Sequence, residues 1–162
     1  MKSIVEILEY LTGQFPDTEF EAVQSDVGPQ RIKVQPSAIK DISKVLRDDY
    51  QFQFNTLMCL TGLHYPNEEE MGVTYHLHST ILGHSLAINV RVPEVKPELP
   101  SIEQIWKTAN WHEREAYDMY GIIFTGHPDL RRILCPNDWE GHPLRKDYVQ
   151  QETYRGITTT ED

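Results

Sequence analysis

Residues 53–92, QFNTLMCLTGLHYPNEEEMGVTYHLHSTILGHSLAINVRV, decide the fold. The first part, residues 53–65, is almost continuously apolar, which is typical of a central strand with both faces covered. After an acidic turn at residues 66–70, apolar residues alternate with polar ones, as in Val73, Tyr75 and Leu77 and again in Leu86, Ile88, Val90 and Val92. The stretch therefore predicts an antiparallel meander.

The preceding residues predict a further strand pair and two helices. Short strands are expected at residues 20–23 and 31–35, separated by a turn at residues 25–29. Helical spacing indicates one helix over residues 4–13, closed by a glycine, and a second over residues 36–46 that begins with proline. We expect the second helix to cover the sheet with its apolar side, formed by Ile39, Ile42, Val45 and Leu46.

The residues after the sheet predict a connector, helical segments and a long irregular arm. PEVKPELP at residues 93–100 is expected to end the sheet as a stiff connector. Ser101 is placed to cap one helical segment, and Asn110 with Glu113 resembles a capping box for another that Gly121 can close. Beyond Gly121 the periodicity stops for about forty residues, so this arm is expected to be ordered by a partner that it wraps.

The fold class is therefore α+β, a mostly antiparallel sheet covered by helices and followed by an extended irregular C-terminal arm. We expect a globular domain at residues 1–112, a signature helix and docking arm at residues 113–148 within the same domain, and a polar tail at residues 149–162.

Composition excludes several classes of function. The 162 residues carry a net charge of -10 with a pI near 5.1, which argues against nucleic acid as a partner. No window approaches the roughly 18 apolar residues that cross a bilayer, and the N-terminus lacks a signal-peptide pattern, so a cytoplasmic protein is expected. Cys59 and Cys135 are far apart without C-x-x-C spacing, which argues against a disulfide framework or a cysteine-ligated cluster.

The arm has the composition of a protein interface. Residues 113–148, EREAYDMYGIIFTGHPDLRRILCPNDWEGHPLRKDY, combine arginine forks, aromatic rings and prolines without catalytic spacing. Within residues 127–148 four basic side chains balance four acids, whereas the rest of the chain carries the negative excess. We predict that replacing Arg131 and Arg132, or Trp139, by alanine weakens binding to a partner by roughly 2 kcal/mol each.

The same run resembles a known family signature. The pattern is E-R-E, two free positions, an acid, two apolar or aromatic residues, six free positions, His or Lys, three free, a basic residue or Pro, one free and two aliphatics. The matching residues are Glu113, Arg114, Glu115, Asp118, Met119, Tyr120, His127, Arg131, Ile133 and Leu134. This pattern, with LRKDY ending at Tyr148, is similar to the C-type subunit, also called the 30-kDa-type subunit, of the proton-pumping NADH:quinone oxidoreductases of respiratory complex I.

The resemblance implies a structural subunit of the peripheral arm of a translocating enzyme complex. FMN, iron–sulfur clusters and quinone would be bound by neighbouring subunits, and this chain would hold no cofactor, metal or catalytic residue. Its partners would be the D-type subunit, which lines the quinone site, and the B-type subunit, on the cytoplasmic side of the cell membrane, with membrane association only through the complex. The expected interface residues are Glu113, Arg114, Glu115, Asp118, Tyr120, Phe124, His127, Asp129, Arg131, Arg132, Trp139, Arg145, Lys146 and Tyr148.

Other interpretations remain open. Arg114 and Asp118 also fit an ordinary intrahelical pair. The near alternative is the equivalent subunit of a membrane-bound hydrogenase or of a ferredoxin- or other donor-driven quinone oxidoreductase. The distant alternative is a stand-alone small hydrolase that uses His76, His78 and an acid around a metal; the two histidines share a strand face, but no third ligand can be named nearby. His112-Glu113 does not complete a zinc-protease motif, and no nucleotide-binding glycine motif is present.

Overall fold

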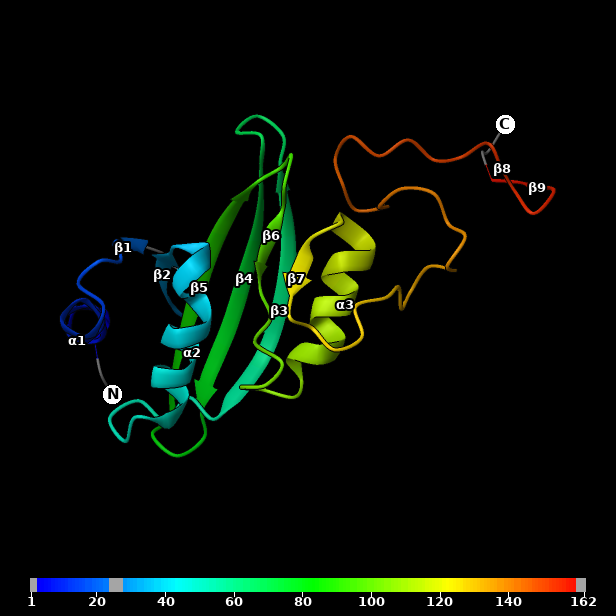
Figure 1. Cartoon of the computed structure of the whole chain (residues 1–162). Helices are drawn as coiled ribbons and strands as arrows, with labels where there is room; N and C mark the ends of the chain where they lie inside the picture. The colour runs from blue at the N-terminus through cyan, green and yellow to red at the C-terminus, as the bar shows by residue number, and fades with distance from the viewer. Residues whose placement is uncertain (1–2, 24–27, 160–162) are drawn as a thin grey trace.

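The structure, a computed structural model, describes residues 3–23 and 28–159. Its main sheet has five strands in the order β1-β2-β5-β4-β3 (Figure 1). The strands are Phe20–Val23 (β1), Gln30–Val34 (β2), Thr56–Tyr65 (β3), Glu70–Ser79 (β4) and His84–Pro93 (β5). Only the β2–β5 pair is parallel within this sheet, so the predicted meander β3-β4-β5 and the predicted strand pair are confirmed. Part of the predicted turn, residues 25–27, lies outside the described residues.

The prediction that residues 53–65 form a central strand is wrong, because β3 is an edge strand. Its pairing with β4 shifts register between Leu57 and Cys59, and Met58 at this irregularity is 61% exposed. The outward side chains Cys59 and Leu63 are only half-buried. An apolar run can therefore arise from one buried face plus a bulge, and does not require a strand covered on both sides.

The first two helices lie on the apolar side of the sheet. Helix α1, Ile4–Gln14, begins with a capping box between Ser3 and Glu6 and runs one residue past Gly13. A 3-10 turn, η1 at Pro36–Ala38, leads into α2, Ile39–Asp48. In Figure 1 α2 lies across the sheet. Its predicted apolar side is confirmed, since Ile39, Ile42 and Leu46 are fully buried and Val45 packs against the same core.

One face of the sheet carries the core. Register aligns Tyr75 with both Leu60 and Ile88, and Ile32 with Ile88, so the buried side chains of four strands meet on one side. The alternate residues, including Thr74 and Asn89, lie on the other side and are half-buried. The sheet therefore has a helix-covered apolar face and a polar face, as expected of an antiparallel sheet.

The Pro-rich segment does more than connect. Glu98–Pro100 forms β6, which pairs in parallel with β7, Ile123–Thr125. Leu99 and Phe124 are both about 1% exposed and belong to the main core. The expectation of a plain connector at residues 93–100 is therefore corrected, because these residues tie the start of the arm to the domain.

Helix α3, Ala109–Tyr120, packs against β3. A Cβ atom on Gly62 of β3 would lie 2.6 Å from the ring of Tyr120, so only glycine permits this approach. The predicted capping box is wrong: Thr108 precedes the helix, and Asn110 and Glu113 lie within it. The predicted end at Gly121 is confirmed by its left-handed backbone, with φ of 80°.

The arm leaves the domain after β7 and runs to one side of it, beyond α3 (Figure 1). The expected boundary between residues 112 and 113 falls inside α3, whose Ala109 and Ala116 belong to the core. Ser101 precedes turns and not a regular helix. The expected polar tail contains a small hairpin of β8, Thr153–Tyr154, and β9, Ile157–Thr158.

Candidate functional site

Asp118, in the last turn of α3, holds the arm. Its Oδ2 atom accepts hydrogen bonds from the backbone N–H groups of Ile133, Leu134 and Cys135 at 2.9, 2.7 and 2.8 Å. Its Oδ1 atom accepts one from Arg132 Nη1 at 2.7 Å. The Asp118 side chain is 0% exposed. We call Asp118, Arg132 and the backbone of residues 133–135 the Asp118 anchor.

The anchor requires an ionised carboxylate. Burial acts to raise the pKa of Asp118, but the three backbone N–H groups and the Arg132 guanidinium together hold it below its ordinary value. Bonds to a charged acceptor are about twice as strong as neutral ones. The carboxylate therefore organises an arm segment that has no helix or strand of its own.

Neighbouring groups of α3 extend the attachment. Arg114 donates from Nε to the carbonyl of Arg131 at 3.2 Å and from Nη2 to that of Arg132 at 3.3 Å. The Leu144 N–H donates to the carbonyl of Met119 at 3.0 Å. The alternative that Arg114 and Asp118 form an ordinary intrahelical pair is therefore wrong, because both side chains bind the arm.

Glu113 is buried on the other side of the same helix. Its carboxylate accepts hydrogen bonds from Ser101 Oγ at 2.5 Å and from the Ile102 N–H at 2.8 Å. Burial is the main cause that raises the pKa of Glu113 to about 7. The bonds from Ser101 and Ile102 act to lower this pKa, and the nearby Glu103 acts to raise it. Glu113 therefore fixes the segment after β6 against α3.

His127 is enclosed beside Glu113. Its ring Nδ1 accepts from the Asp129 N–H at 3.0 Å, so the proton of the neutral ring lies on Nε2, 3.1 Å from the carbonyl of Asn110. Its side chain is 0% exposed. The histidine of the signature thus fastens the turn after β7 to the start of α3.

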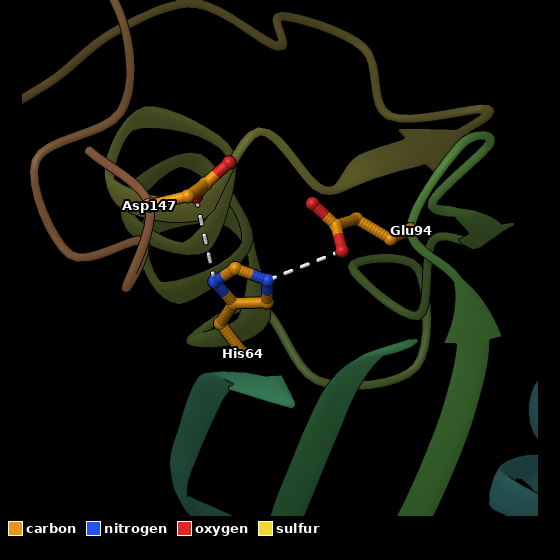
Figure 2. Close-up of side chains that lie close together, drawn as sticks. All are labelled: His64, Glu94 and Asp147. Atoms are coloured by element: carbon orange, nitrogen blue, oxygen red, sulfur yellow. Dashed lines mark ion pairs between the residues drawn. The ribbon is translucent and has the colours of Figure 1, made fainter. Parts of the chain in front are cut away.

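A second attachment joins the arm to the sheet (Figure 2). The buried imidazole of His64 lies between two carboxylates, with Nε2 3.3 Å from Glu94 Oε2 and Nδ1 3.6 Å from Asp147 Oδ1. Arg145 pairs with both carboxylates, and its bond to Asp147 lowers the pKa of that acid. The Lys146 N–H donates to His64 Nδ1 at 2.9 Å. We call His64, Glu94, Arg145 and Asp147 the His64 clamp.

Within the His64 clamp, His64, Glu94 and Asp147 form the only group of three potential metal ligands among the described residues, with ligand atoms within 4.8 Å of one another. The donors do not converge, however, because the imidazole stands between the carboxylates and uses a different nitrogen toward each (Figure 2). Nδ1 already accepts from the Lys146 N–H, and Arg145 pairs with both acids. This chemistry fits an ion-pair clamp better than a metal centre.

The far end of the arm is also tied down. Trp139 Nε1 donates to the hydroxyl of Tyr148 at 3.2 Å, and the Trp139 ring contacts Tyr154. Asp138 accepts from Tyr154 and from Arg155, at 3.0 Å and 3.0–3.1 Å. These contacts attach the small hairpin of the polar tail to residues 138–148 of the arm.

The predicted interface residues divide into two groups. Glu113, Arg114, Asp118 and Phe124 are buried, the His127 side chain is enclosed, and Arg132 and Arg145 side chains are 13% and 22% exposed. In this chain they contact their own arm or domain, and their direct contact with a partner stays a prediction. The residues that remain accessible are Glu115, Asp129, Arg131 and Lys146, with Tyr120, Trp139 and Tyr148 half-buried.

Several apolar side chains that the sequence did not single out are exposed around the arm. Leu134 is 62% exposed, Leu144 49% and Val149 86%, and Trp111 on α3 is 62% exposed with Arg114 beside its ring. Exposed apolar side chains can contribute to an interaction surface, although others, such as Tyr50 and Val95, are exposed elsewhere on the chain. The sequence did offer one indication of their exposure: most of them lie in a segment without helical or strand periodicity, where no core position is expected.

The distant hydrolase alternative gains no support at His76 and His78. His78 Nδ1 lies 2.9 Å from Ser85 Oγ. Neither histidine belongs to a group of three possible ligands in residues 3–23 and 28–159.

Residues 32–154 match the family described as respiratory-chain NADH dehydrogenase, 30 Kd subunit. The chain belongs to this family. It is 56% identical, over 118 residues, to the C-type subunit of the NADH-quinone oxidoreductase of Chlorobium phaeobacteroides, an alignment that covers 72% of this chain and 71% of that protein. The resemblance drawn from the signature is thereby confirmed.

Solved structures agree with the 30-kDa subunit fold. The trypsin-resistant fragment (1-134) of Nqo5 matches with a TM-score of 0.61 and 30% identity, covering 76% of this chain and 99% of the fragment. A chain of the archaeal membrane-bound sulfane sulfur reductase matches with a TM-score of 0.74 and 23% identity, covering 90% and 85%. The predicted α+β class with a mainly antiparallel sheet is confirmed. None of the described helices is long and apolar enough to cross a membrane.

Proposed function

We propose that this chain is a structural subunit of the peripheral arm of an NADH:quinone oxidoreductase and that α3 with the arm contacts the D-type subunit, which lines the quinone site. The observation that carries the proposal is the 56% identity to a protein named as the C-type subunit of an NADH-quinone oxidoreductase. In this proposal the enzyme transfers electrons from NADH through flavin and iron–sulfur clusters to quinone, coupled to proton translocation. Neighbouring subunits hold these groups and this chain holds none.

The structure suggests how the arm could dock. The Asp118 anchor and the His64 clamp fix its backbone, while Leu134 and Leu144 project from the surface. A segment already held in its binding conformation loses less conformational freedom when a partner binds. We therefore infer that the charged signature residues shape the arm and that the exposed apolar residues supply most of the contact with the D-type subunit.

The B-type subunit as a second partner, and a peripheral position on the cytoplasmic side of the membrane, follow from the same proposal. The chain would reach the membrane only through the complex. A net charge of -10 is unfavourable for direct binding to anionic lipid and is compatible with this arrangement.

A related enzyme with another electron donor is the second candidate. The observation behind this candidate is that a chain of the sulfane sulfur reductase has the same fold. At 23% identity this likeness concerns the fold alone. A complex that contains hydrogenase subunits, or that accepts electrons from ferredoxin and not from NADH, would identify this second function.

The proposal can be tested by purification from the native host. The chain is tagged, membranes are solubilised in mild detergent, co-purifying subunits are identified by mass spectrometry, and NADH-dependent quinone reduction is assayed. Recovery of the flavin, iron–sulfur and quinone-site subunits with this activity is expected. Recovery of the chain alone would contradict the proposal.

A pair of variants tests the docking surface. Leu134→Glu should lower the recovery of the D-type subunit about tenfold, because a charge would be buried at the contact. Ile81→Glu is the matched control: Ile81 is 64% exposed, close to the 62% of Leu134, but lies in the turn between β4 and β5. If the two variants recover the D-type subunit equally, Leu134 does not belong to the interface.

A further inference from the structure

The polar face of the sheet carries a row of side chains that runs across four strands. Register places Cys59 of β3 opposite His76 of β4, His76 opposite Ala87 of β5, and Ala87 beside Arg31 of β2. All four belong to the face opposite the core, because their neighbours along each strand, such as Ile32 and Leu77, are core residues. The apolar faces of α1 and α2 pack on the other side of the sheet.

Among the described residues, Arg31 lacks the carboxylate partner that other bases on this face have. Lys33 lies 3.7 Å from Glu21, and Arg91 lies 3.1 Å from Glu70. No carboxylate among residues 3–23 and 28–159 pairs with Arg31, whose Nε atom is buried without a hydrogen-bond acceptor. A buried donor without an acceptor is destabilising, and more so when the group is charged. The acceptor is therefore expected from outside the residues that the structure describes.

A pocket of about 550 Å³ lies next to this arginine, lined by Pro29, Met58, Cys59, His76, Leu77 and Ser85. The pKa of His76 is lowered first by burial and then by the nearby charge of Arg31. The positive charge of Arg31 therefore acts on a side chain that lines the pocket. The irregularity in β3 turns Met58 outward at the opposite wall. Methionine adapts to apolar side chains of varied shape, and bulges often re-aim a side chain at a binding site.

We propose that this row is a second docking site, independent of the arm, for a segment of another subunit that presents a carboxylate to Arg31 and a neighbouring apolar side chain to the pocket beside Met58. The inference rests on the proposed function, since the occupant is a subunit of the same complex. A planar guanidinium accepts a carboxylate through two parallel hydrogen bonds. Although the chain as a whole is acidic, the local positive charge of Arg31, which has no carboxylate partner among the described residues, favours an acidic partner segment by charge complementarity beside the pocket.

The test uses the tagged chain in the assembled complex. The photo-crosslinking residue p-benzoylphenylalanine replaces Met58, the complex is purified from irradiated membranes, and the crosslinked peptide is sequenced by mass spectrometry. The variants Arg31→Gln and Lys33→Gln are compared in this background. Lys33 is the matched control, because it lies on the same strand and face but already has Glu21 as a partner.

The expected result is a crosslink to a co-purifying subunit, within a peptide that has Asp or Glu within a few residues of the attachment point. Arg31→Gln should lower the crosslink yield by about tenfold, whereas Lys33→Gln should leave it unchanged. Exchange of charges, with Arg31→Glu combined with an acid-to-Arg change in the partner, should restore the yield.

Other outcomes overturn the inference. One such outcome is an assembled, active complex in which the residue at position 58 gives no crosslink. A crosslink only to lipid, to a second copy of this chain or to a segment without acids would have the same meaning. Each of these results would exclude the docking site and leave the proposed function intact. An unchanged yield in Arg31→Gln would do the same. Failure of the chain to co-purify with any oxidoreductase subunit would overturn both.

Discussion

The Asp118 carboxylate and the Arg132 guanidinium lie 2.7 Å apart and join the last turn of α3 to the arm. Asp118 is fully buried, and Arg132 also donates to the carbonyl of Gly141 at 2.7 Å. The pair therefore connects three segments that are distant in sequence. Removal of one member of a buried, hydrogen-bonded pair leaves the other without its counter-charge.

We expect Asp118→Asn to loosen the arm. The neutral amide cannot accept from three backbone N–H groups and a guanidinium with the strength of a carboxylate, so the arm should lose about 3 kcal/mol of local stability. Hydrogen exchange at the amides of residues 133–135 should accelerate by two orders of magnitude or so. Asp129→Asn is the control, since Asp129 pairs with Arg131 at the surface. Equal protection in both variants would contradict the anchor.

Glu113 should make the stability of the chain depend on pH. Its pKa is raised from an ordinary value of 4.5 to about 7, so between these values the folded chain holds a proton that the unfolded chain has released. The free energy of unfolding should therefore fall as pH rises from about 4.5 to 7, by about 3 kcal/mol from this group, and stay low above that range.

Denaturant unfolding of Glu113→Gln measures this effect. The amide oxygen can still accept from Ser101 and from the Ile102 N–H, but it does not ionise. The variant should be more stable than the parent at pH 8 and similar to it at pH 4. Glu115→Gln, at an exposed position of the same helix, should follow the parent. A constant difference between Glu113→Gln and the parent at both pH values would refute the prediction.

Gly62→Ala should destabilise the domain by about 1–3 kcal/mol. Its Cβ would meet Tyr120 at 2.6 Å and would push α3 away from β3. Gly13→Ala is a suitable control, because a Cβ there meets nothing within 4 Å and alanine favours the helix. Thermal unfolding should show a lower Tm only for Gly62→Ala. A Tm equal to that of the parent would mean that the helix and the strand are free to separate.

Zinc should not stabilise the chain through the His64 clamp. The imidazole nitrogens face Lys146 and Glu94, and Arg145 already pairs with both carboxylates, so a metal would have to displace these contacts. Thermal unfolding with zinc and with a chelator should give the same Tm. A zinc-dependent rise in Tm that disappears in His64→Ala would establish a metal site there.

Much of the fold was predictable from periodicity. The alternation at Val73, Tyr75 and Leu77 identified β4 because one sheet face is buried and the other is polar. The position of β3 at the edge was not predictable, since strand order depends on which residues pair across the sheet. The β6–β7 pair was missed for a related reason: three residues are too few to show alternation, and Glu98 and Ile123 are 25 positions apart.

The signature marked residues of the candidate site but did not show the contacts that they make within the chain. Asp118, Arg132 and His127 were interpreted as part of a surface for a partner, which stays a prediction, and in the structure each bonds to another segment of the same chain. A sequence does not show that a carboxylate will meet backbone N–H groups 15 to 17 residues later, as Asp118 does. His64 and Glu94 were missed because each lies at the end of a strand-like run. Their role depends on contacts with Arg145 and Asp147 of the arm, which are distant in sequence.

The double role of α3 limits how this protein can be rebuilt. The helix contributes Ala109 and Ala116 to the core while its carboxyl-terminal turn, through Asp118 and the carbonyl of Met119, sets the path of the arm. An arm grafted onto another scaffold would lose its shape unless that last helical turn travelled with it. Conversely, a redesigned core that rotated α3 by a few degrees would move every exposed side chain of the arm, even though no arm residue had been changed.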